Sequence, residues 1–458
     1  MARKVYMISG GVSKFAKARK DKTFQALVKE AYDHALTDHS LKKGRKEIHQ
    51  QIDGSVASYF SDHFTHQAMA GAMVQDYLGL IPRPSHRVEG GGATGGLCFQ
   101  AAYKEVASEQ MNLCVAYGFE VMSHVNTWKG NEFIALASDV SFDYPVGGFY
   151  AGYYSLMITR HMHEFGTTAE QMACVSVKNH RNAMFNPYAQ KGGLLTIEEV
   201  RRSPVIAWPL NRLDICVMSD GAAACLLADE DTAYELTDQP IEVKSVGAGT
   251  DAMRLADRPH KDPVLLPHES SSEYEGKQFV GGRLRFPGVH SCRAGRVAAQ
   301  QAYKKAQVIN PARDLDFVEL HDAFTSSELQ TVEDLGLCRY GESGPFTMAG
   351  NTFMPNIEYG LDLPKQGTIP VNPSGGLLAC GHPIGATGLM QAVFAFWQLQ
   401  GSIPRHFGQA GMGLEEAKVL QLENPRRGAI HSHAGTGTYV TVSVLERPQD
   451  VSVEEVAT

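Results

Sequence analysis

The sequence lacks the cysteine and histidine motifs that are typical of metal-binding proteins. None of its eight cysteines forms a C-x-x-C pair, and this excludes a zinc ribbon. The histidines of HMHEF (161–165) do not have the H-E-x-x-H spacing of a zinc protease. Most cysteines lie in apolar runs such as NLCVAYG and AACLLA, which is typical of buried, reduced thiols. We therefore expect no metal site and a cytoplasmic protein.

Long apolar runs and an excess of basic residues are also missing. No stretch is long enough to span a bilayer, and the basic N-terminus lacks the apolar run of a secretory signal. The formal net charge is −8, which argues against nucleic acid or an anionic membrane as the main partner. What is present is a globular composition, 43% hydrophobic and 20% charged, that can bury a large core.

Short β-rich runs alternate with helical segments along the 458 residues, and this alternation predicts layers of helix and sheet. One unit occurs twice: a strand, a glycine-rich turn and an apolar helix at 88–107 and again at 371–399. We therefore predict two similar halves, residues 1–238 and 239–458. The stretch 123–212, rich in His, Tyr and Asn, is predicted to be an insertion that forms a lid.

The glycines of VEGGGATGG raise the question of a nucleotide site. Gly90, Gly92 and Gly95 have the spacing G-x-G-x-x-G of a dinucleotide-binding turn. That motif follows a clear strand and has an acidic residue about 20 positions on, but neither Glu109 nor Glu120 ends a recognisable second strand. The alternative fits better: a tight turn that packs a buried helix closely against the sheet.

Two histidines lie at positions suited to proton transfer. His382 stands between two glycine turns in NPSGGLLACGHPIGATG, and Pro383 fixes the backbone behind it. His321 ends the predicted strand of LDFVELHDAF, at the edge where α/β proteins gather their ligands. Asp322 either orients this loop or caps the helix that follows. The turn in HSHAGTG (431–437) either presents backbone N–H groups to a developing oxyanion or simply leads into a strand.

Four segments, found in this order, resemble the thiolase superfamily: NHRNAMFNPYAQ, PLNRLDICVMSDGAAACLLA, FVELHDAFTSSELQTVEDLG and VNPSGGLLACGHPIGATG. The resemblance covers nearly the whole chain. It is closest to sterol-carrier-protein-type thiolases and to thiolase-like proteins that work with zinc-ribbon/OB-fold partners. It implies a five-layered αβαβα fold, a homodimer or larger oligomer, and a small zinc-ribbon/OB-fold partner subunit. It also implies action on acyl-CoA, with coenzyme A as substrate or product and no tightly bound cofactor.

The resemblance also assigns residues, and here the chain departs from the family. The family's nucleophilic cysteine lies in V-[NE]-x-x-C-[AS]-[ST]-G, and Gly92 stands at its place. The second, acid/base cysteine is matched by Ala323, or by Ser432 and its neighbours in the C-terminal turn. His382 corresponds to the histidine that activates the nucleophile, and His321 corresponds to the oxyanion-hole histidine.

Backbone N–H groups need no side chain, so Gly92 and Gly435 are expected to form the second oxyanion hole. Cys380, beside the Gly-His-Pro turn, and Cys98, six residues beyond Gly92, are alternative nucleophiles, although buried packing is the favoured interpretation of both. Candidates for contacts with coenzyme A are positions in the matched segments: Asn179, His180, Ser374 and Gly375.

Covalent acyl transfer needs a nucleophile, so the missing cysteine bears on the reaction. We predict an enzyme that makes or breaks a carbon–carbon bond next to an acyl-CoA carbonyl, an acyl-CoA C-acyltransferase of the thiolase kind. Two alternatives stay open: a retro-aldolase on β-hydroxyacyl-CoA, and a non-catalytic acyl-CoA-binding subunit of a complex. An engineered replacement at Gly92 is also left open. The aromatic stretch 142–154 is predicted either to cover a bulky acyl chain or to pack in a dimer interface.

Overall fold

One nine-stranded sheet runs through the computed structural model, which describes residues 3–258, 264–270, 278–279, 282–283, 288–363 and 367–454. The strand order is β11-β12-β13-β8-β1-β7-β4-β2-β3. The strands of the first half are β1 (Val5–Val12), β2 (Gly54–Ser58), β3 (Ser85–Val88), β4 (Leu113–Val121) and β7 (Asp220–Asp229). Those of the second half are β8 (Ile241–Thr250), β11 (Phe317–Glu319), β12 (Arg427–Ala434) and β13 (Tyr439–Glu446).

The two halves of the sheet repeat one pattern. The order β1-β7-β4-β2 in the first half corresponds to β8-β13-β12-β11 in the second, and in both only the last pair is parallel. The halves join where Tyr6 pairs with Glu242 and Met7 with Ile241. The repeat confirms a fold of two similar halves. The predicted boundary after residue 238 lies just before β8, and as a domain boundary it stays a prediction.

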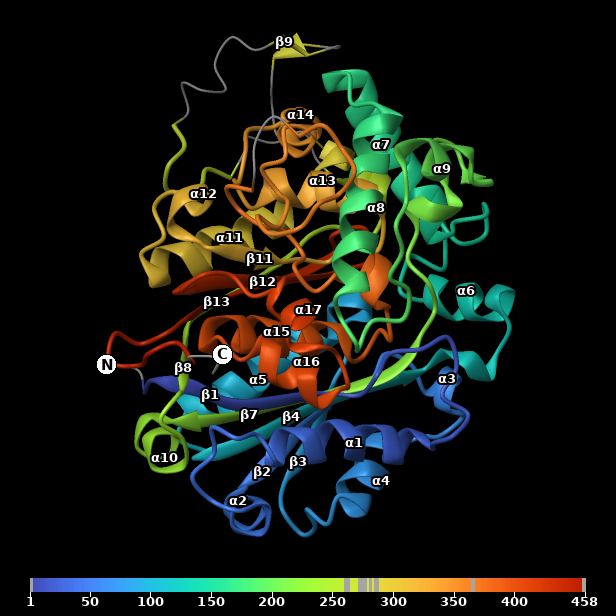
Figure 1. The fold of residues 1–458 in the computed structure, drawn as a ribbon. Coiled ribbons are helices and arrows are strands. Elements are labelled where there is room, and N and C mark those ends of the chain that lie inside the picture. Colours follow the sequence, from blue (N-terminus) through green and yellow to red (C-terminus); the bar gives the residue numbers. More distant parts are fainter. Residues whose placement is uncertain are drawn as a thin grey trace.

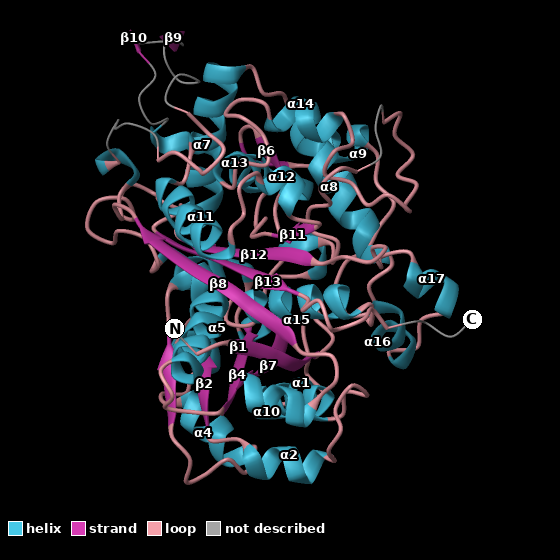
Figure 2. Ribbon diagram, turned by 90° about the vertical axis from the view of Figure 1, so that its left-hand side faces the viewer, coloured by secondary structure: helices cyan, strands magenta, loops and turns pink. Residues whose placement is uncertain are grey.

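Helices and strands alternate in five layers (Figure 1). The first-half strands are covered on their outer face by α1 (Phe24–Leu36), α4 (Ala70–Tyr77) and α10 (Glu230–Leu236). The second-half strands are covered by α11 (Arg293–Ala306), and α13 (Thr325–Asp334) packs against α11. Between the two groups of strands lie α5 (Thr94–Ala107) and α15 (Thr387–Gln400). Figure 2, a side view, shows these two helices between the magenta strands. The predicted αβαβα fold is therefore confirmed.

The helices α5 and α15 in the middle layer contact each other closely at a glycine of the G-x-G-x-x-G motif. All 14 residues of α15 are buried, because strands cover it on both sides, and the helix accordingly has no polar face. A Cβ atom added at Gly95 of α5 would lie only 2.7 Å from the backbone nitrogen of Gly388 in α15. Gly95 thus lets α5 approach α15, while Gly92 lies close to the carbonyl oxygen of His433 in β12, so the turn also packs against the sheet as expected.

Between β4 and β7 the chain leaves the repeat and forms four helices, seen in green at the right of Figure 1. They are α6 (Thr127–Ala135), α7 (Tyr150–Phe165), α8 (Ala169–Met184) and α9 (Ile197–Arg202). The Thr168 side chain caps α8 by accepting the backbone N–H of Gln171, whose side chain accepts the N–H of Thr168 in return. These helices lie within the predicted insertion 123–212, whose action as a lid stays a prediction.

The remaining elements are short. The helices are α2 (Arg45–Gln51), α3 (Asp62–Thr65), α12 (Pro311–Asp314), α14 (Ser343–Met348), α16 (Ile403–Gln409) and α17 (Leu414–Lys418). The strands are β5 (Val205–Ala207), β6 (Leu210–Asn211), β9 (Gln278–Phe279) and β10 (Gly282–Arg283). Within the described ranges, we find no helix with the length and apolar character needed to cross a bilayer.

Candidate active site

Three histidines meet near the carboxyl ends of two neighbouring strands. His321 follows β11, His433 lies near the end of β12, and His382 follows the short π-helical turn η7 (Gly376–Cys380). The ring centroid of His321 lies 5.0 Å from that of His382 and 4.2 Å from that of His433. Since β11 and β12 are parallel, residues that follow their ends come together. The structure thus brings together the two histidines singled out in the sequence and adds a third.

Burial keeps these imidazoles uncharged. The exposed fractions of His321, His382 and His433 are 3%, 9% and 1%. Burial lowers the pKa of His382 to about 3. Burial also lowers the pKa of His321 and His433 well below its ordinary value, and neighbouring imidazoles lower it further. At neutral pH each ring is therefore neutral, with one N–H donor and one nitrogen lone pair.

Gly92 lies beside the rings, in the turn η1 (Gly91–Ala93) that leads into α5. It is partly exposed, whereas both neighbours in the turn are buried. A Cβ atom added at Gly92 would lie 2.6 Å from the carbonyl oxygen of His433 and 3.0 Å from Cε1 of His321. Ordinary van der Waals contact begins at 3.4 Å, so a side chain at position 92 requires the backbone to move. The turn is built around a residue without a side chain.

The C-terminal glycine turn lies against η1. A Cβ atom added at Gly91 would lie 3.1 Å from Cβ of Ala434, the residue before Gly435. Gly435 has φ +62°, a left-handed conformation that favours glycine. The two glycines expected to donate backbone N–H groups, Gly92 and Gly435, are therefore carried by adjoining segments, next to the N-terminus of α5, where the helix dipole favours negative charge.

His433 and Tyr154 form a pair that our sequence analysis did not single out. The Tyr154 hydroxyl lies 2.5 Å from Nε2 of His433 and donates to the carbonyl oxygen of Gly435 at 3.1 Å. The Tyr154 ring, only 2% exposed, stacks on Phe324 with the centroids 4.3 Å apart. Tyr154 lies in the aromatic stretch 142–154, so one residue of this stretch reaches the histidine cluster from α7.

Strand alternation is a signal in the sequence that could have indicated His433. In β12, neighbouring side chains point to opposite faces of the sheet. Accordingly the His431 and His433 rings lie 5.4 Å apart, and Nδ1 of His431 accepts the backbone N–H of His321 at 3.4 Å. The intervening Ser432, which we matched to the family's second cysteine, faces the middle helices and donates to Oε1 of Gln391 at 3.0 Å.

A buried polar network joins the loops of His321 and His382. The Asp322 carboxylate accepts the backbone N–H of Leu377 at 2.6 Å and the Asn179 amide at 2.6 Å. Asn179 also donates to Glu328 at 2.8 Å, and Glu328 pairs with Lys178 at 3.0 Å. The four polar side chains are fully buried, and burial together with Glu328 raises the pKa of Asp322 well above its usual range. Asp322 therefore orients the loop that carries His382 and does not cap α13.

Comparison with known proteins agrees with this geometry. Residues 5–231 match the family Thiolase, N-terminal domain, and residues 287–447 match Thiolase C-terminal domain-like. The chain is 34% identical over 427 residues to Acetyl-CoA acetyltransferase of Methanothermobacter thermautotrophicus, across 93% of this chain and 95% of that protein. The chain belongs to the thiolase superfamily.

Within the thiolase superfamily, the chain is 29% identical over 413 residues to Sterol carrier protein 2 of Homo sapiens, which covers 87% of this chain and 66% of that protein. This similarity confirms the predicted sterol-carrier-protein type. The solved structure named Ltp2-ChsH2(DUF35) aldolase has a TM-score of 0.71 and covers 98% of this chain and 99% of its own. At 22% identity it shows the shared fold.

The polar groups of the residues expected to contact coenzyme A form hydrogen bonds with other groups of the protein. Asn179 belongs to the buried network, and Ser374 donates its hydroxyl to Glu319 at 2.7 Å. Nδ1 of the buried His180 lies 2.9 Å from the carbonyl oxygen of Ser176 in the same helix. Gly375 is buried in a left-handed turn with φ +98°. All four positions are thus enclosed by protein in this structure, and their contact with coenzyme A stays a prediction.

The alternative nucleophiles are buried thiols of the thiolase core. Cys98 is fully buried and donates to the carbonyl of Val56 at 3.3 Å, and burial raises its pKa to about 12. Cys380 is also fully buried, and burial together with Glu319 and Asp322 raises its pKa well above the ordinary value. A nucleophilic thiol needs the thiolate form, which burial opposes at both positions. The packing interpretation of both cysteines therefore fits the structure.

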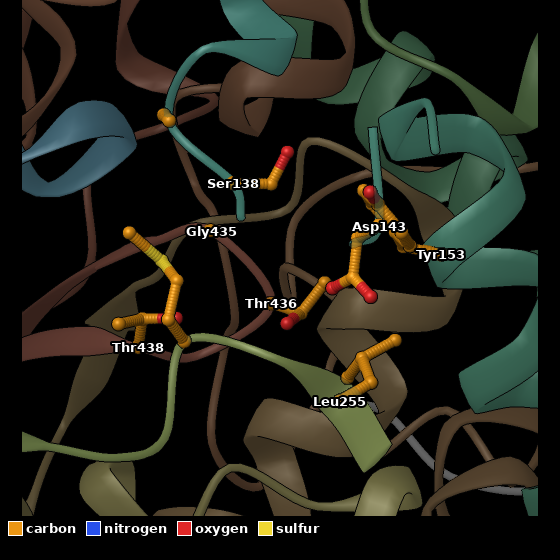
Figure 3. Close-up of a pocket in the computed structure, with 9 residues that line it drawn as sticks. Ser138, Asp143, Tyr153, Leu255, Gly435, Thr436 and Thr438 are labelled. Atoms are coloured by element: carbon orange, nitrogen blue, oxygen red, sulfur yellow. The ribbon is translucent and has the colours of Figure 1, made fainter. Parts of the chain in front are cut away.

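A small pocket opens beside the C-terminal glycine turn of this thiolase-superfamily protein (Figure 3). Gly435, Thr436 and Thr438 form one wall, and Ser138 and Asp143 from the insertion form another. The histidine rings are not among its lining residues, so the pocket adjoins the histidine cluster and does not contain it. Among the described residues, no His, Cys, Asp and Glu side chains are grouped so as to hold a metal ion.

Proposed function

We propose that this thiolase-fold protein makes or breaks a carbon–carbon bond next to the thioester carbonyl of an acyl-CoA without a covalent acyl–enzyme. One observation supports this above the others: the site has two neutral imidazoles beside a glycine turn that has no room for a nucleophilic side chain. Of the reactions open to such a site, retro-aldol cleavage of a 3-hydroxyacyl-CoA fits best, because it needs a stabilised enolate and a base but no nucleophile.

The thioester oxygen would be stabilised by donors fixed before the reaction starts. A neutral histidine still donates one N–H bond, so His321 can act in this way despite its lowered pKa. The backbone N–H groups of Gly92 and Gly435 and the N-terminus of α5 favour negative charge at the same place. Donors held by a rigid network lose little energy to rearrangement when that charge develops, and the Asp322 network supplies such rigidity.

The reaction balances with residues of this site. A base takes the proton of the 3-hydroxyl, the carbonyl π bond forms at that carbon, and the Cα–Cβ bond breaks. Its electron pair enters the thioester as an enolate, which accepts a proton at Cα by way of His382. The products are an aldehyde or ketone and a shorter acyl-CoA, with no net gain or loss of protons. Coenzyme A thus belongs to the substrate and the product, and is not a bound cofactor.

Thiolytic acyl transfer is the second candidate, because a relative 34% identical to this chain is named Acetyl-CoA acetyltransferase. Without a cysteine at position 92, this reaction would need the thiolate of free coenzyme A to attack a 3-ketoacyl-CoA directly. A non-catalytic acyl-CoA-binding subunit is the third candidate. It has no need for a cluster of three imidazoles, whose burial opposes their charging.

Product analysis separates the three candidates. The protein is incubated with short, long and aromatic 3-hydroxyacyl-CoA esters, and separately with 3-ketoacyl-CoA esters plus free coenzyme A. The proposal expects aldehyde and a shorter acyl-CoA from the hydroxy esters. Turnover of keto esters alone would favour thiolysis. Binding without turnover of either set would favour the silent subunit and contradict the proposal.

We also propose that the protein acts as an assembly in the cytoplasm. β3 ends the sheet with exposed residues, and an open strand edge invites pairing with another chain. Trp128, Val146 and Trp208 lie in the insertion and expose 81%, 85% and 66% of their surface, which a homodimer partner or a small zinc-ribbon/OB-fold subunit would cover. The fold neighbour Ltp2-ChsH2(DUF35) aldolase is itself named as a pair. All eight cysteines are unpaired, as suits a reducing compartment.

A further inference from the structure

The proposed cleavage leaves one task without a residue, the removal of the 3-hydroxyl proton. His321 is assigned to the thioester oxygen and His382 to Cα. The remaining imidazole of the cluster is His433, whose ring centroid lies 4.2 Å from that of His321. Its carbonyl oxygen is the atom nearest to the missing side chain of Gly92, so its backbone borders the space where the substrate is expected.

The hydrogen bonds of Tyr154 determine which nitrogen of His433 carries the proton. A carbonyl oxygen can only accept, so the bond of 3.1 Å to Gly435 uses the hydroxyl proton of Tyr154. The phenol oxygen is then left to accept, and the contact of 2.5 Å is satisfied when Nε2 of His433 donates. This arrangement satisfies both bonds at once. It leaves the lone pair on Nδ1 of His433.

That nitrogen is available for a proton. Nδ1 of His433 is buried and has no hydrogen-bond partner among the described residues. The groups that face the ring from neighbouring elements are the imidazoles of His321, His382 and His431, the Tyr154 hydroxyl and the Arg258 guanidinium. Arg258 is held by Thr436 in the same turn and disfavours a charged imidazole at rest. A buried nitrogen lone pair without a partner is costly in a folded protein and calls for a functional explanation.

We propose that His433 is the base that takes the 3-hydroxyl proton on Nδ1, and that Tyr154 is the positioning residue that fixes its tautomer; this inference rests on the proposed retro-aldol function. As the proton arrives at Nδ1, Nε2 keeps its own and continues to donate to Tyr154, whose hydroxyl stays on Gly435. The imidazolium forms while negative charge moves onto the thioester. His382 then gives its proton to Cα and receives the proton from Nδ1 of His433, so that both charges vanish and both rings return to their neutral form.

Two substitutions and two reactions test this assignment. Tyr154→Phe removes the hydroxyl and leaves the stacked ring, and His433→Asn removes the base. Tyr150→Phe is the matched control, one helical turn earlier on α7, with a hydroxyl that forms no bond to His433 or Gly435. The first reaction is cleavage of 3-hydroxybutanoyl-CoA. The second is deuterium uptake at Cα of butanoyl-CoA in heavy water, which needs the enolate and His382 but not the hydroxyl base.

The inference predicts that the two reactions separate. His433→Asn should lower kcat for cleavage by about 10²- to 10⁴-fold, the usual contribution of a general base, and Tyr154→Phe by about 10-fold or more. Deuterium uptake in both variants should stay within about threefold of the wild type, and KM for the hydroxy ester should stay within about twofold. Tyr150→Phe should behave as the wild type in both reactions. Retained exchange shows that a variant is folded.

Contrary results point to different parts of the account. Cleavage at the wild-type rate in His433→Asn or in Tyr154→Phe would overturn the inference and leave the proposed function standing. Equal loss of cleavage and exchange in both variants would show a structural role and would also overturn it. A wild-type protein that neither cleaves hydroxy esters nor exchanges the α-proton would overturn the proposed function itself, and this inference with it.

Discussion

Gly92→Ala is the smallest perturbation of the centre of the site, because it adds one methyl group. That methyl carbon would lie 2.6 Å from the carbonyl oxygen of His433, about 0.8 Å short of ordinary contact at 3.4 Å. The obstructing atom belongs to the backbone, so no side-chain rotation relieves the contact. Either η1 or the end of β12 must shift by most of that distance, which moves the donors of Gly92 or the ring of His433.

The expected cost can be stated for both stability and rate. Overpacking a well-packed site costs about 1–3 kcal/mol, and we expect a loss of that order in urea-induced unfolding. Displacing catalytic groups by about 1 Å lowers rates by about 10²-fold, so cleavage and α-proton exchange should both fall by roughly that factor. Gly92→Cys should behave in the same way and should gain no thiolytic activity, because its Cβ meets the same oxygen.

Gly408→Ala in α16 is the matched control. A Cβ atom there meets nothing within 4 Å, and alanine favours a helix over glycine, so its stability should be unchanged or higher by about 0.5–1 kcal/mol. The rates of this control should equal those of the wild type. If Gly92→Ala kept full activity and full stability, our reading of the turn as one built without a side chain would be refuted.

Three further predictions concern the residues around this turn. His382→Asn should lower both α-proton exchange and cleavage by about 10²- to 10⁴-fold in the deuterium assay, and unchanged exchange would remove His382 from the proton path. Lys178→Met should cost about 3–5 kcal/mol in urea unfolding because it leaves the buried Glu328 unpaired, and adding Glu328→Leu should restore part of the loss; no rescue would contradict the pairing. Burial lowers the pKa of His431 from 6.5 to about 3. This imidazole therefore binds a proton near pH 6.5 in the unfolded chain but stays neutral at that pH in the folded protein. Stability is therefore lost as pH falls below 6.5, by about 2 kcal/mol at pH 5, and His431→Gln should lose that much less between pH 7 and pH 5 than the wild type does.

The sequence was sufficient for the layers of the fold and for part of the site. The repeated unit of strand, glycine turn and apolar helix predicted two similar halves, and the strand order of the sheet repeats accordingly. His321 and His382 were recognisable because a strand end and a rigid Gly-His-Pro turn are local features. Gly92 was singled out because it stands where the family resemblance places the nucleophilic cysteine, and that correspondence stays a prediction.

The rest of the site depends on contacts that local patterns do not carry. Tyr154 lies in the insertion and contacts His433, which is 279 positions away in the sequence. No local sequence pattern around either residue therefore indicates that the two form a pair. Asn179 and Ser374 were candidates for contacts with a ligand because they lie in the segments that match the family. The structure encloses them with Asp322 and Glu319, where their bonds hold the histidine loops in place.

The most direct test of the central claim is the intact mass of the protein during turnover. The wild type is mixed with 3-hydroxybutanoyl-CoA, and the reaction is stopped with acid at times before and after the first turnover. The intact mass of the protein is measured by mass spectrometry, and acetaldehyde and acetyl-CoA are measured in the same samples. Our account predicts an unmodified protein mass at every time point at which these products appear. A transient acetyl adduct on any cysteine, formed and consumed at the rate of turnover, would contradict it.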